Sequence, residues 1–341
     1  MKKILLLLTI LTLLGSSPAP GERTVLPAPA ISARSALVMD ADTGRVLYAR
    51  EADRRSLIAS TTKIMTGFLI CRDLDPDLCV TVPEEAVGIE GSSIYLQSGE
   101  ELRVRDLLLG MLLHSGNDAA AALAILHSGS IEDFAAEMNR TACGLGLTDT
   151  SFANPHGLDS EENYSTARDL ARLAAAALEN KLFLETVSTK TCTVGERTLT
   201  NHNKLLWQYP GCIGVKTGYT KAAGRILVSS AERAGRRLIC VTIHAPDDWR
   251  DHCALLDWAF ARYEARDLAR KGERLMISPE PGSKPLIAAA SLTVPMLPEE
   301  EVRLEYLPRF AGAFDVSPDA GFVRVWIESR LLAEIPVVRG N

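Results

Sequence analysis

The sequence predicts a mixed α/β (α+β) fold followed by a small all-β domain, and three observations support this prediction. Short strand patterns lie near the start and near the end of the first 268 residues, and a long stretch of helical periodicity separates them. After Ala269, Pro and Gly become frequent and alternation of period two replaces the helical spacing. With 341 residues, the chain has room for about two domains. We therefore expect a leader over residues 1–30, a main domain over residues 31–268 and a β domain over residues 269–341.

The leader has the residue order of a secretory signal. Lys2 and Lys3 precede an apolar run from Ile4 to Leu14, and small and Pro-rich residues follow it. As a helix, this run is too short to cross a hydrocarbon core of about 30 Å. The small-x-small sequence that ends at Ala30 is a candidate cleavage site. We expect the mature chain to work outside the cytoplasm, and a buried N-terminal helix is the alternative interpretation.

Residues 35–49 predict a β-hairpin, because two apolar runs flank the turn-forming residues Asp40 to Gly44. Apolar residues then recur at helical spacing in three segments, 63–70, 104–113 and 118–127.

Further along the chain, Thr166 to Asp169 resembles a capping box that opens another helix. Residues 225–229 and 238–243 are short strand candidates, and residues 249–263 return to helical spacing. The C-terminal alternation is carried by two sets of apolar residues, Val302, Leu304 and Tyr306, and Val323, Val325 and Ile327.

Composition excludes several classes of protein. Apolar residues make up 47% and charged residues 23% of the chain, which is typical of a globular protein and not of a disordered or multi-span membrane protein. The formal net charge is −6 and no long run of Lys or Arg occurs, so we expect no nucleic-acid partner. The six histidines form no HExxH sequence and no i, i+4 pair, so we expect no metal and no cofactor.

The seven cysteines are too few for a disulfide-built scaffold. We interpret them as small buried apolar residues. A disulfide between Cys71 and Cys79, which are close in sequence, is the alternative.

Three short motifs carry the predicted chemistry, and the first is Ser60-Thr61-Thr62-Lys63. A serine hydroxyl is a weak nucleophile near neutral pH and needs a base beside it. On a helix, positions i and i+3 share a face, so the Lys63 amine is expected to reach the Ser60 hydroxyl. Lysine serves as a base when desolvation or a neighbouring cation lowers its pKa.

The second motif is Ser115-Gly116-Asn117, between two apolar helical segments. Its hydroxyl is suited to relay a proton and its amide to hold a substrate carbonyl. The third motif is Lys216-Thr217-Gly218, after an apolar run. We expect its cation and hydroxyl to bind a carboxylate, and the absent side chain of Gly218 to let a peptide pair with the backbone as an added strand.

The three motifs, in this order and tens of residues apart, are the set known for penicillin-binding proteins and related serine β-lactamases. The chain resembles the low-molecular-mass penicillin-binding proteins, which are serine-type D-alanyl-D-alanine carboxypeptidases. The resemblance covers about residues 35–263 and includes residues 37–67, Phe152 to Leu158 and the region around Lys216. It implies a serine β-lactamase/penicillin-binding-protein-like catalytic domain, with the family's small β domain at the C-terminal end.

The resemblance also implies a mechanism. Ser60 attacks the carbonyl between the two D-alanines of a peptidoglycan muropeptide, with Lys63 as the base. Ser115 and Asn117 assist proton transfer and hold the substrate. The terminal D-alanine leaves, and water hydrolyses the acyl-enzyme on Ser60. β-Lactam antibiotics are then expected to acylate the same serine.

The substrate-binding residues follow from the same resemblance. Lys216 and Thr217, together with Arg250, are expected to bind the terminal carboxylate. The backbone N–H groups of Ser60 and of Tyr219, which follows Gly218, are expected to form the oxyanion hole. We assign His156 a structural role, because it lies in a Pro/Gly turn and the mechanism needs no histidine.

Two alternatives stay open at this point. One is a class A-like β-lactamase, which relies on a glutamate for deacylation, although no ExxLN-like segment lies between Asn117 and Lys216. The other is a catalytically inactive cell-wall-binding homologue. Many members of the family end in an amphipathic helix that docks on the membrane. The sequence has none at its end, so peripheral membrane association is also left open.

Overall fold

The structure is a computed structural model that describes residues 26–275, 277, 284–308 and 319–340. The predicted secretory signal falls on residues 1–25, which lie outside the described residues. Within the described part of the chain, no helix is both long enough and apolar enough to span a membrane.

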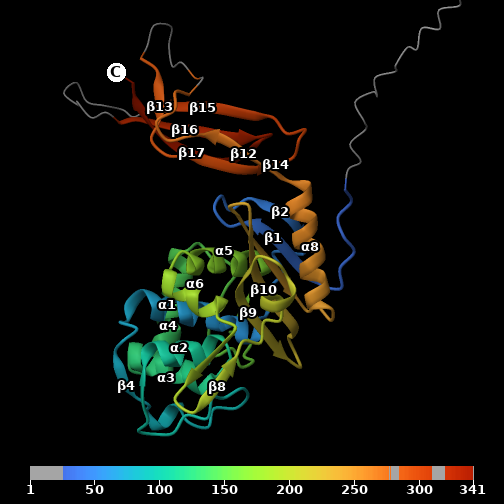
Figure 1. Ribbon diagram of the computed structural model, residues 1–341. Coiled ribbons are helices and arrows are strands. Elements are labelled where there is room, and N and C mark those ends of the chain that lie inside the picture. The colour runs from blue at the N-terminus through green and yellow to red at the C-terminus, as the bar shows by residue number, and fades with distance from the viewer. Residues whose placement is uncertain (1–25, 276, 278–283, 309–318, 341) are drawn as a thin grey trace, which may run out of the picture.

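A five-stranded antiparallel sheet organises the main part of the chain (Figure 1). Its strand order is β2-β1-β11-β10-β9, so the last of these strands is an edge. The hairpin expected over residues 35–49 is confirmed, and both predicted strand segments near residues 225–243 belong to this sheet. The strands are β1 (Ser35–Asp40), β2 (Val46–Arg50), β9 (Cys212–Thr220), β10 (Gly224–Arg233) and β11 (Arg236–Ile243).

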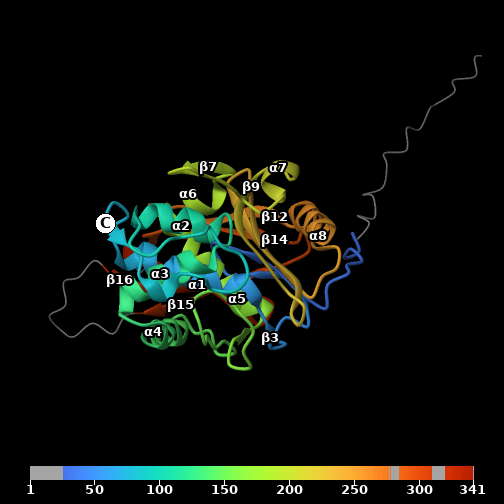
Figure 2. The same ribbon diagram turned by 90° about the horizontal axis from the view of Figure 1, so that it is seen from below.

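Helices cover both faces of the sheet. Successive side chains of a strand point to opposite faces, so a continuous apolar run gives two apolar faces. Leu37 and Met39 of β1 belong to the larger core, and Val38 belongs to a second core with Leu255 of α8 (Asp248–Arg262). Figure 2 shows α8 on one side of the sheet and the helical layer on the other.

The helical layer comes from the long segment between β2 and β9. Three of its helices begin within one residue of the predicted segments 63–70, 104–113 and 118–127. The helices are α1 (Lys63–Asp73), α2 (Val104–Leu112), α3 (Asn117–Ser128), α4 (Ile131–Gly144), α5 (Ala167–Leu178) and α6 (Lys181–Ser188).

The cap predicted at Thr166 is half correct. Its side-chain oxygen accepts a hydrogen bond from the Asp169 N–H at 3.1 Å, which satisfies one of the free donors at the start of α5. The Asp169 carboxylate does not complete the capping box. It accepts hydrogen bonds from the Asp149 N–H and the Thr150 hydroxyl, each at 2.9 Å. The first turn of α5 is thereby tied to the preceding loop.

Short elements connect these layers. Two 3₁₀ turns, one four-residue helix and three two-stranded ribbons lie between the longer elements of the described residues. They are η1 (Ala59–Thr62), η2 (Glu84–Ala86), α7 (Leu205–Gln208), β3 (Ser56–Leu57) with β6 (Tyr164–Ser165), β4 (Cys79–Thr81) with β5 (Glu101–Arg103), and β7 (Thr191–Val194) with β8 (Arg197–Thr200).

The C-terminal region is all β in the described residues. It contains a two-stranded ribbon and a four-stranded antiparallel sheet of order β13-β17-β16-β15. Val323 and Val325 are buried and alternate with partly exposed neighbours, as the period-two pattern predicts. The strands are β12 (Glu264–Ala269), β13 (Leu286–Ala288), β14 (Leu292–Met296), β15 (Val302–Pro308), β16 (Asp319–Ile327) and β17 (Arg330–Arg339).

The expected boundary at residue 268 falls inside β12, which pairs with β14 and starts at Glu264. The C-terminal sheets lie beyond the β1–β2 end of the central sheet (Figure 1). Arg45, between β1 and β2, forms an ion pair with Glu300 and donates to the Pro295 carbonyl at 2.5 Å. The hairpin turn therefore contacts the C-terminal region, and the division of the chain into two domains stays a prediction.

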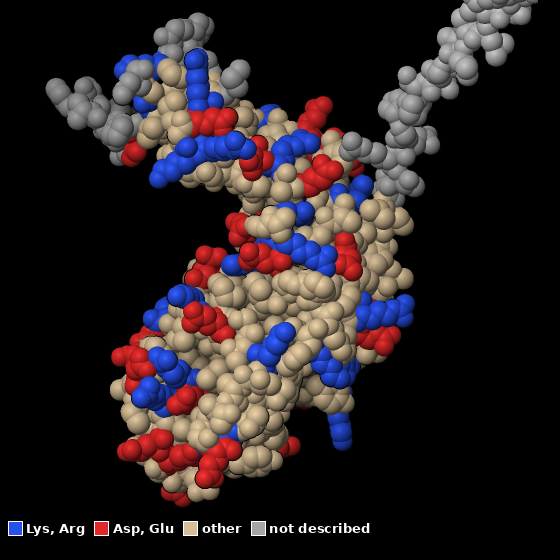
Figure 3. Space-filling view, in the orientation of Figure 1, with Lys and Arg blue, Asp and Glu red and all other residues tan. Residues whose placement is uncertain are grey.

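Charge on the face drawn in Figure 3 is mixed. Acidic and basic side chains are interspersed there and form no continuous basic stripe. The expectation that nucleic acid is not a partner stays a prediction.

The interpretation of the cysteines is correct for only some of them. Cys71 and Cys240 are buried, but Cys79 and Cys143 are exposed, and all seven cysteines are free. The Cys71–Cys79 disulfide that was kept as an alternative is therefore wrong. Cys71 packs in the main core, while Cys79 is an exposed residue of the short strand β4.

We expect a maleimide to label Cys79 and Cys143 of the native protein before Cys240. The first two thiols are exposed, whereas full burial raises the pKa of the Cys240 thiol well above its usual value. Intact-protein mass spectrometry followed by peptide mapping measures the order of labelling. Cys143→Ser is the control and removes one early adduct. Labelling of Cys79 only after addition of a reductant would contradict the structure.

Candidate active site

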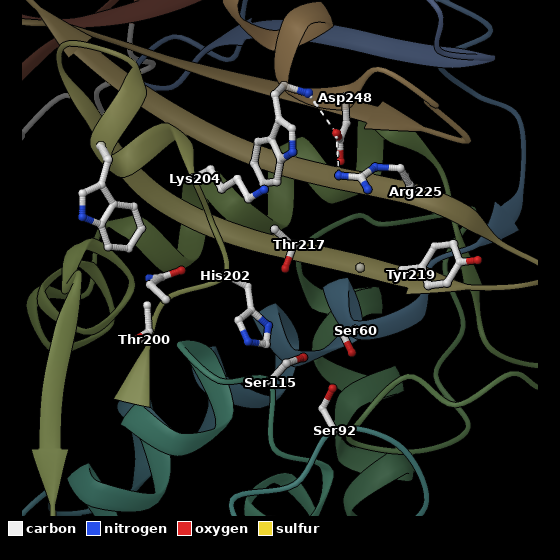
Figure 4. Close-up of a pocket in the computed structure, with 14 residues that line it drawn as sticks. Ser60, Ser92, Ser115, Thr200, His202, Lys204, Thr217, Tyr219, Arg225 and Asp248 are labelled. Carbon is white, nitrogen blue, oxygen red and sulfur yellow. Dashed lines mark hydrogen bonds and ion pairs between the residues drawn. The ribbon is translucent and has the colours of Figure 1, made fainter. Parts of the chain in front are cut away.

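A cavity of about 670 Å³ lies between the helical layer and the edge strand β9. Its walls bring together residues from distant parts of the sequence, including Ser60, Ser115, Thr217, Gly218 and Tyr219. Figure 4 shows Ser60, Ser115 and Thr217 grouped around the middle of this cavity. The three motifs of the sequence therefore meet at one place.

Ser60 lies on the 3₁₀ turn η1, directly before helix α1. Residues i and i+3 of a 3₁₀ helix stand almost above each other, so this turn aligns Ser60 with Lys63. The Lys63 Nζ atom is 3.0 Å from the Ser60 Oγ atom. The i, i+3 contact predicted from the sequence is present, although a 3₁₀ turn and not an α-helical turn provides it.

Lys63 is completely buried, and its amino group is surrounded by acceptors. It donates to the Asn117 Oδ1 atom at 2.7 Å and to the His156 carbonyl oxygen at 2.6 Å. Burial, and then the positive charge of Lys216, hold the pKa of Lys63 well below its usual value. A neutral amine in this position has a lone pair that can take the proton of the Ser60 hydroxyl.

Lys216 is the second buried lysine of the site. It lies on β9, and burial lowers its pKa to about 7. Its Nζ atom donates to the Thr217 carbonyl oxygen at 3.0 Å. Lys216 supplies positive potential to the site when it is protonated, and the neighbouring Thr217 lines the cavity.

The second motif forms the wall opposite β9. Asn117, the first residue of α3, donates from its Nδ2 atom to the Glu90 carbonyl oxygen at 2.5 Å and from its backbone N–H to the Ser92 carbonyl oxygen at 2.7 Å. Asn117 thereby connects the Lys63 amine to the loop that contains Glu90 and Ser92. Ser115, two residues earlier, has a backbone φ of +67°, a strained conformation for a residue with a side chain. That conformation holds the Ser115 side chain in the wall of the cavity.

Gly218 also has a local packing role that was not predicted, while its role in substrate binding stays a prediction. A Cβ atom at this position would lie 3.1 Å from the Ile58 carbonyl oxygen and 3.2 Å from the Thr61 nitrogen. The missing side chain therefore lets β9 lie directly against the turn that carries Ser60. Gly218 thus allows β9 to pack close to the turn that carries Ser60.

Gly157 was not predicted to matter on its own, but it shapes the same turn. It has φ of +92°, and a Cβ atom there would lie 2.0 Å from the Ala59 carbonyl oxygen and 3.0 Å from the Ser60 nitrogen. Asn154 braces this loop, because its Oδ1 atom accepts from the Gly157 N–H at 2.7 Å. The segment Phe152 to Leu158 thus packs against the backbone of the turn that carries Ser60.

His156 contributes its backbone and not its ring to Lys63. Its carbonyl oxygen accepts from the Lys63 amine, while its Nδ1 atom accepts from the Leu158 N–H at 3.3 Å. Burial, and then the charge of Lys63, lower the pKa of the His156 ring to about 4. The ring is therefore neutral near pH 7, in keeping with a structural role.

The structure does not bring Arg250 into the cavity. Arg250 is exposed on α8 and is not among the residues that line the cavity. Arg225, at the start of β10, lies in the wall instead and forms an ion pair with the buried carboxylate of Asp248 at 2.9 Å. Sequence reasoning missed Arg225, since only the β9–β10 pairing places it opposite Tyr219.

The described residues contain no group of three or more His, Cys, Asp or Glu side chains that could hold a metal ion. The chemistry available at the site is that of a serine nucleophile, a buried amine and the backbone N–H groups around them.

Comparison with known proteins identifies one family, and the match covers most of the chain. A family model described as D-alanyl-D-alanine carboxypeptidase matches residues 22–247. The D-alanyl-D-alanine carboxypeptidase DacF of Bacillus subtilis is 39% identical over 254 residues, which are 71% of this chain and 65% of the relative. DacC of Escherichia coli is 38% identical over 259 residues, which are 71% of this chain and 64% of the relative. The matches therefore span slightly less than two thirds of these relatives.

Solved structures extend the likeness to the C-terminal region. Penicillin-binding protein 5 of Haemophilus influenzae has a TM-score of 0.78 and 29% identity, and the match covers 93% of this chain and 98% of that one. The Streptomyces K15 DD-transpeptidase has a TM-score of 0.66 and 34% identity over 69% of this chain and 100% of its own. The shared motifs, the family match and these structures together show that the chain belongs to the D-alanyl-D-alanine carboxypeptidase family of low-molecular-mass penicillin-binding proteins.

Proposed function

We propose that the chain is a serine D-alanyl-D-alanine carboxypeptidase that removes the terminal D-alanine from peptidoglycan stem pentapeptides. The contact between the Ser60 hydroxyl and the buried amine of Lys63 carries this proposal. A lysine that is desolvated and close to a second cation is neutral at a pH where an exposed lysine is charged. It is then a base within reach of the nucleophile.

In the acylation step, Lys63 takes the hydroxyl proton of Ser60 while the Ser60 Oγ atom attacks the peptide carbonyl. The backbone N–H groups of Ser60 and Tyr219 stabilise the negative oxygen that develops. The Ser115 hydroxyl passes a proton to the leaving amine, the C–N bond breaks and D-alanine departs. Water then attacks the ester on Ser60, which releases the shortened peptide and restores the serine.

Substrate binding uses the open edge of β9. An extended peptide adds to this edge as a further strand, because β9 has a neighbour in the sheet only on its β10 side among the described residues. Lys216 and Thr217 bind the terminal carboxylate. We assign the additional cation for that carboxylate to Arg225 and not to Arg250, since Arg225 is the one in the cavity wall.

The proposed setting is the outer face of the cell. The signal-like leader, the muropeptide substrate and the family's cell-wall chemistry all favour an extracytoplasmic enzyme. β-Lactam antibiotics would enter the same cavity and acylate Ser60. Residues 31–268 would form the catalytic domain and residues 269–341 a small β domain beside it.

A class A-like β-lactamase is less well supported. Such an enzyme relies on a glutamate for deacylation. Among the described residues that line the cavity there is no glutamate, and the only carboxylate, Asp248, is paired with Arg225. An acyl-enzyme formed by an antibiotic would therefore be long-lived.

Benzylpenicillin should form a one-equivalent adduct on Ser60 that persists for minutes to hours. The physical reason is that the described cavity walls hold no unpaired carboxylate base to speed hydrolysis of the ester. Intact-protein mass spectrometry over time measures the adduct, and release of D-alanine from a stem pentapeptide measures the reaction. Ser60→Ala should remove the adduct and lower D-alanine release by about 10⁴-fold or more. Rapid consumption of the antibiotic without a trapped adduct would favour the β-lactamase.

The pH dependence of kcat/KM should have two limbs with different origins. On the acid side the rate falls because Lys63 becomes protonated and can no longer act as a base. Above about pH 7 it falls because Lys216, whose pKa is about 7, loses the charge that binds the carboxylate. Lys216→Gln should remove the alkaline limb. It should also move the acid limb to higher pH, because the loss of a neighbouring cation raises the pKa of Lys63.

Lys181→Gln is the matched control for this experiment, because Lys181 is exposed on α6 and does not line the cavity. Its pH profile should equal that of the unchanged protein. An alkaline limb that stays near pH 7 in Lys216→Gln would show that another group titrates there.

Gly157→Ala should slow acylation of Ser60 by about a hundredfold, because the added Cβ atom displaces the nucleophile turn by a fraction of an ångström or more. Gly129→Ala is the matched control. Gly129 has a similar φ of +86°, but its Cβ atom would meet nothing within 4 Å. Both variants should lose stability through backbone strain, and only Gly157→Ala should lose acylation rate. Equal acylation rates in a benzylpenicillin time course would refute the role given to Gly157.

A further inference from the structure

A second cavity, of about 480 Å³, lies where the C-terminal region meets the main part of the chain. Its walls come from the turn between β1 and β2, from the first half of α5 and from the turn between β16 and β17. Figure 3 shows the molecule narrowed and hollowed between these two regions. None of the described residues that line this cavity also lines the one that holds Ser60, so the two are separate.

The wall formed by the β1–β2 turn is held in a fixed shape. The Thr43 N–H and hydroxyl donate to the buried carboxylate of Asp40 at 3.0 and 2.6 Å. The next wall residue, Arg45, forms its ion pair with Glu300, and only about a tenth of each of these two side chains is exposed. The Glu300 carboxylate also accepts from the Leu297 N–H at 2.8 Å. The two regions therefore meet at a buried ion pair in the wall of the cavity.

Positive charge exceeds negative charge in these walls, although the whole chain has a formal net charge of −6. The charged residues that line the cavity are Arg45, Arg168, Arg172, Arg330, Glu300 and Glu328. Two of the arginines are neutralised, since Arg45 is paired with Glu300 and Arg168 is paired with Asp53. The other two, Arg172 and Arg330, supply the excess.

Arg172 and Arg330 have few contacts inside the protein. The Arg330 guanidinium forms no ion pair or hydrogen bond with the described residues. Arg172 has two long contacts, from its Nη1 atom to the Asp169 carboxylate at 3.8 Å and to the Gly146 carbonyl oxygen at 3.4 Å. Glu328, the remaining acid of the wall, forms an ion pair with neither arginine within the described part of the chain. Two guanidinium groups are thus available to an anion, one from each region.

The arrangement favours a phosphate over a carboxylate. A guanidinium group binds either anion with two parallel N–H donors. In this protein Arg168 already uses both oxygens of the Asp53 carboxylate, at 2.5 and 3.0 Å, so one arginine occupies one carboxylate. A tetrahedral phosphate carries oxygens on more than one side and can accept from two arginines on different walls. A volume of about 480 Å³ also leaves room for the group that a phosphate ester carries.

We propose that this cavity is a binding site for a phosphate group, held between Arg172 of α5 and Arg330 of β17. The bound group links the C-terminal region to the main part of the chain beside the ion pair of Arg45 and Glu300. A ligand that binds only the folded chain stabilises it, so phosphate should raise the temperature of unfolding. The site takes no part in the chemistry at Ser60, which lies in the other cavity.

The test is calorimetric titration of the full mature chain with inorganic phosphate, in a chloride buffer of constant ionic strength. The expected result is saturable binding of one equivalent. Arg172→Gln and Arg330→Gln should each weaken binding by about five- to tenfold, a modest change because both side chains are exposed to solvent. The double variant should show no saturable binding. Glu328→Gln removes the unpaired acid of the wall and should strengthen binding by about twofold.

Arg140→Gln is the matched control. Arg140 is exposed on α4 and pairs with Glu137 at a spacing of i, i+3, the same spacing that joins Arg172 to Asp169. Arg140 does not line the cavity, so its replacement should leave phosphate binding unchanged. Absence of saturable binding by the unchanged protein would overturn the proposal. Binding that the double variant retains would overturn it as well.

Two further probes identify the source of the phosphate. One is a soluble oligomer of glycerol phosphate, and the other is vesicles of phosphatidylglycerol and phosphatidylcholine, which are sedimented with the protein. The probe that carries the natural group should bind the unchanged protein and lose binding in the double variant. If both fail while inorganic phosphate binds, the ligand is a small phosphate compound.

The proposed function is tested separately on the same variants. Release of D-alanine and the benzylpenicillin adduct on Ser60 should be unchanged in all of them, because the substituted residues lie outside the active-site cavity. Thermal unfolding without phosphate checks that each variant is folded. Loss of D-alanine release in a folded variant would contradict the separation of the two sites. Phosphate binding by a chain that forms no adduct would contradict the proposed function and leave this inference standing.

Discussion

The burial of one amino group, that of Lys63, is the constraint on which the rest of the site depends. Moving an ammonium ion out of water costs several kcal/mol in a protein interior, so the site favours a neutral amine. Three oxygen atoms, from Ser60, Asn117 and His156, surround the Lys63 Nζ atom. They come from three separate segments, and the amine holds those segments together. The contacts that surround the proposed base therefore also hold the Ser60 hydroxyl in place.

The turn that carries Ser60 depends on two neighbouring residues that have no side chain. Gly157 and Gly218 approach the turn from two sides, and a Cβ atom on either would meet its backbone. Ala59 itself has a φ of +45°, a conformation that costs energy for a residue with a side chain. Packing from both sides holds this strain in place, so the Ser60 hydroxyl is oriented before any substrate arrives. Preorganisation of this kind reduces what must be rearranged in the transition state.

The sequence was informative where chemistry depends on neighbours in the chain. The contact between Ser60 and Lys63 follows from a spacing of three residues, and the hairpin and the first three helices follow from local periodicity. Features that depend on tertiary pairing were not predictable. The His156 carbonyl meets Lys63 across 93 residues of sequence, and nothing local marks it as a partner of the amine. Likewise, Arg225 reaches the cavity through strand register, while Arg250 is exposed on α8.

The open edge of β9 has a consequence for the behaviour of the protein in solution. A strand with unpaired backbone groups is a template on which a second chain can assemble, and proteins usually protect such edges. Here the edge faces the walls of a cavity, with the nucleophile turn on one side and Tyr219 and Trp249 at its rim. Such walls restrict access to the edge, and a broad sheet of another folded molecule needs more open space beside a strand than a single extended segment does. The enclosure proposed to receive the substrate thus also protects this edge from pairing with other molecules.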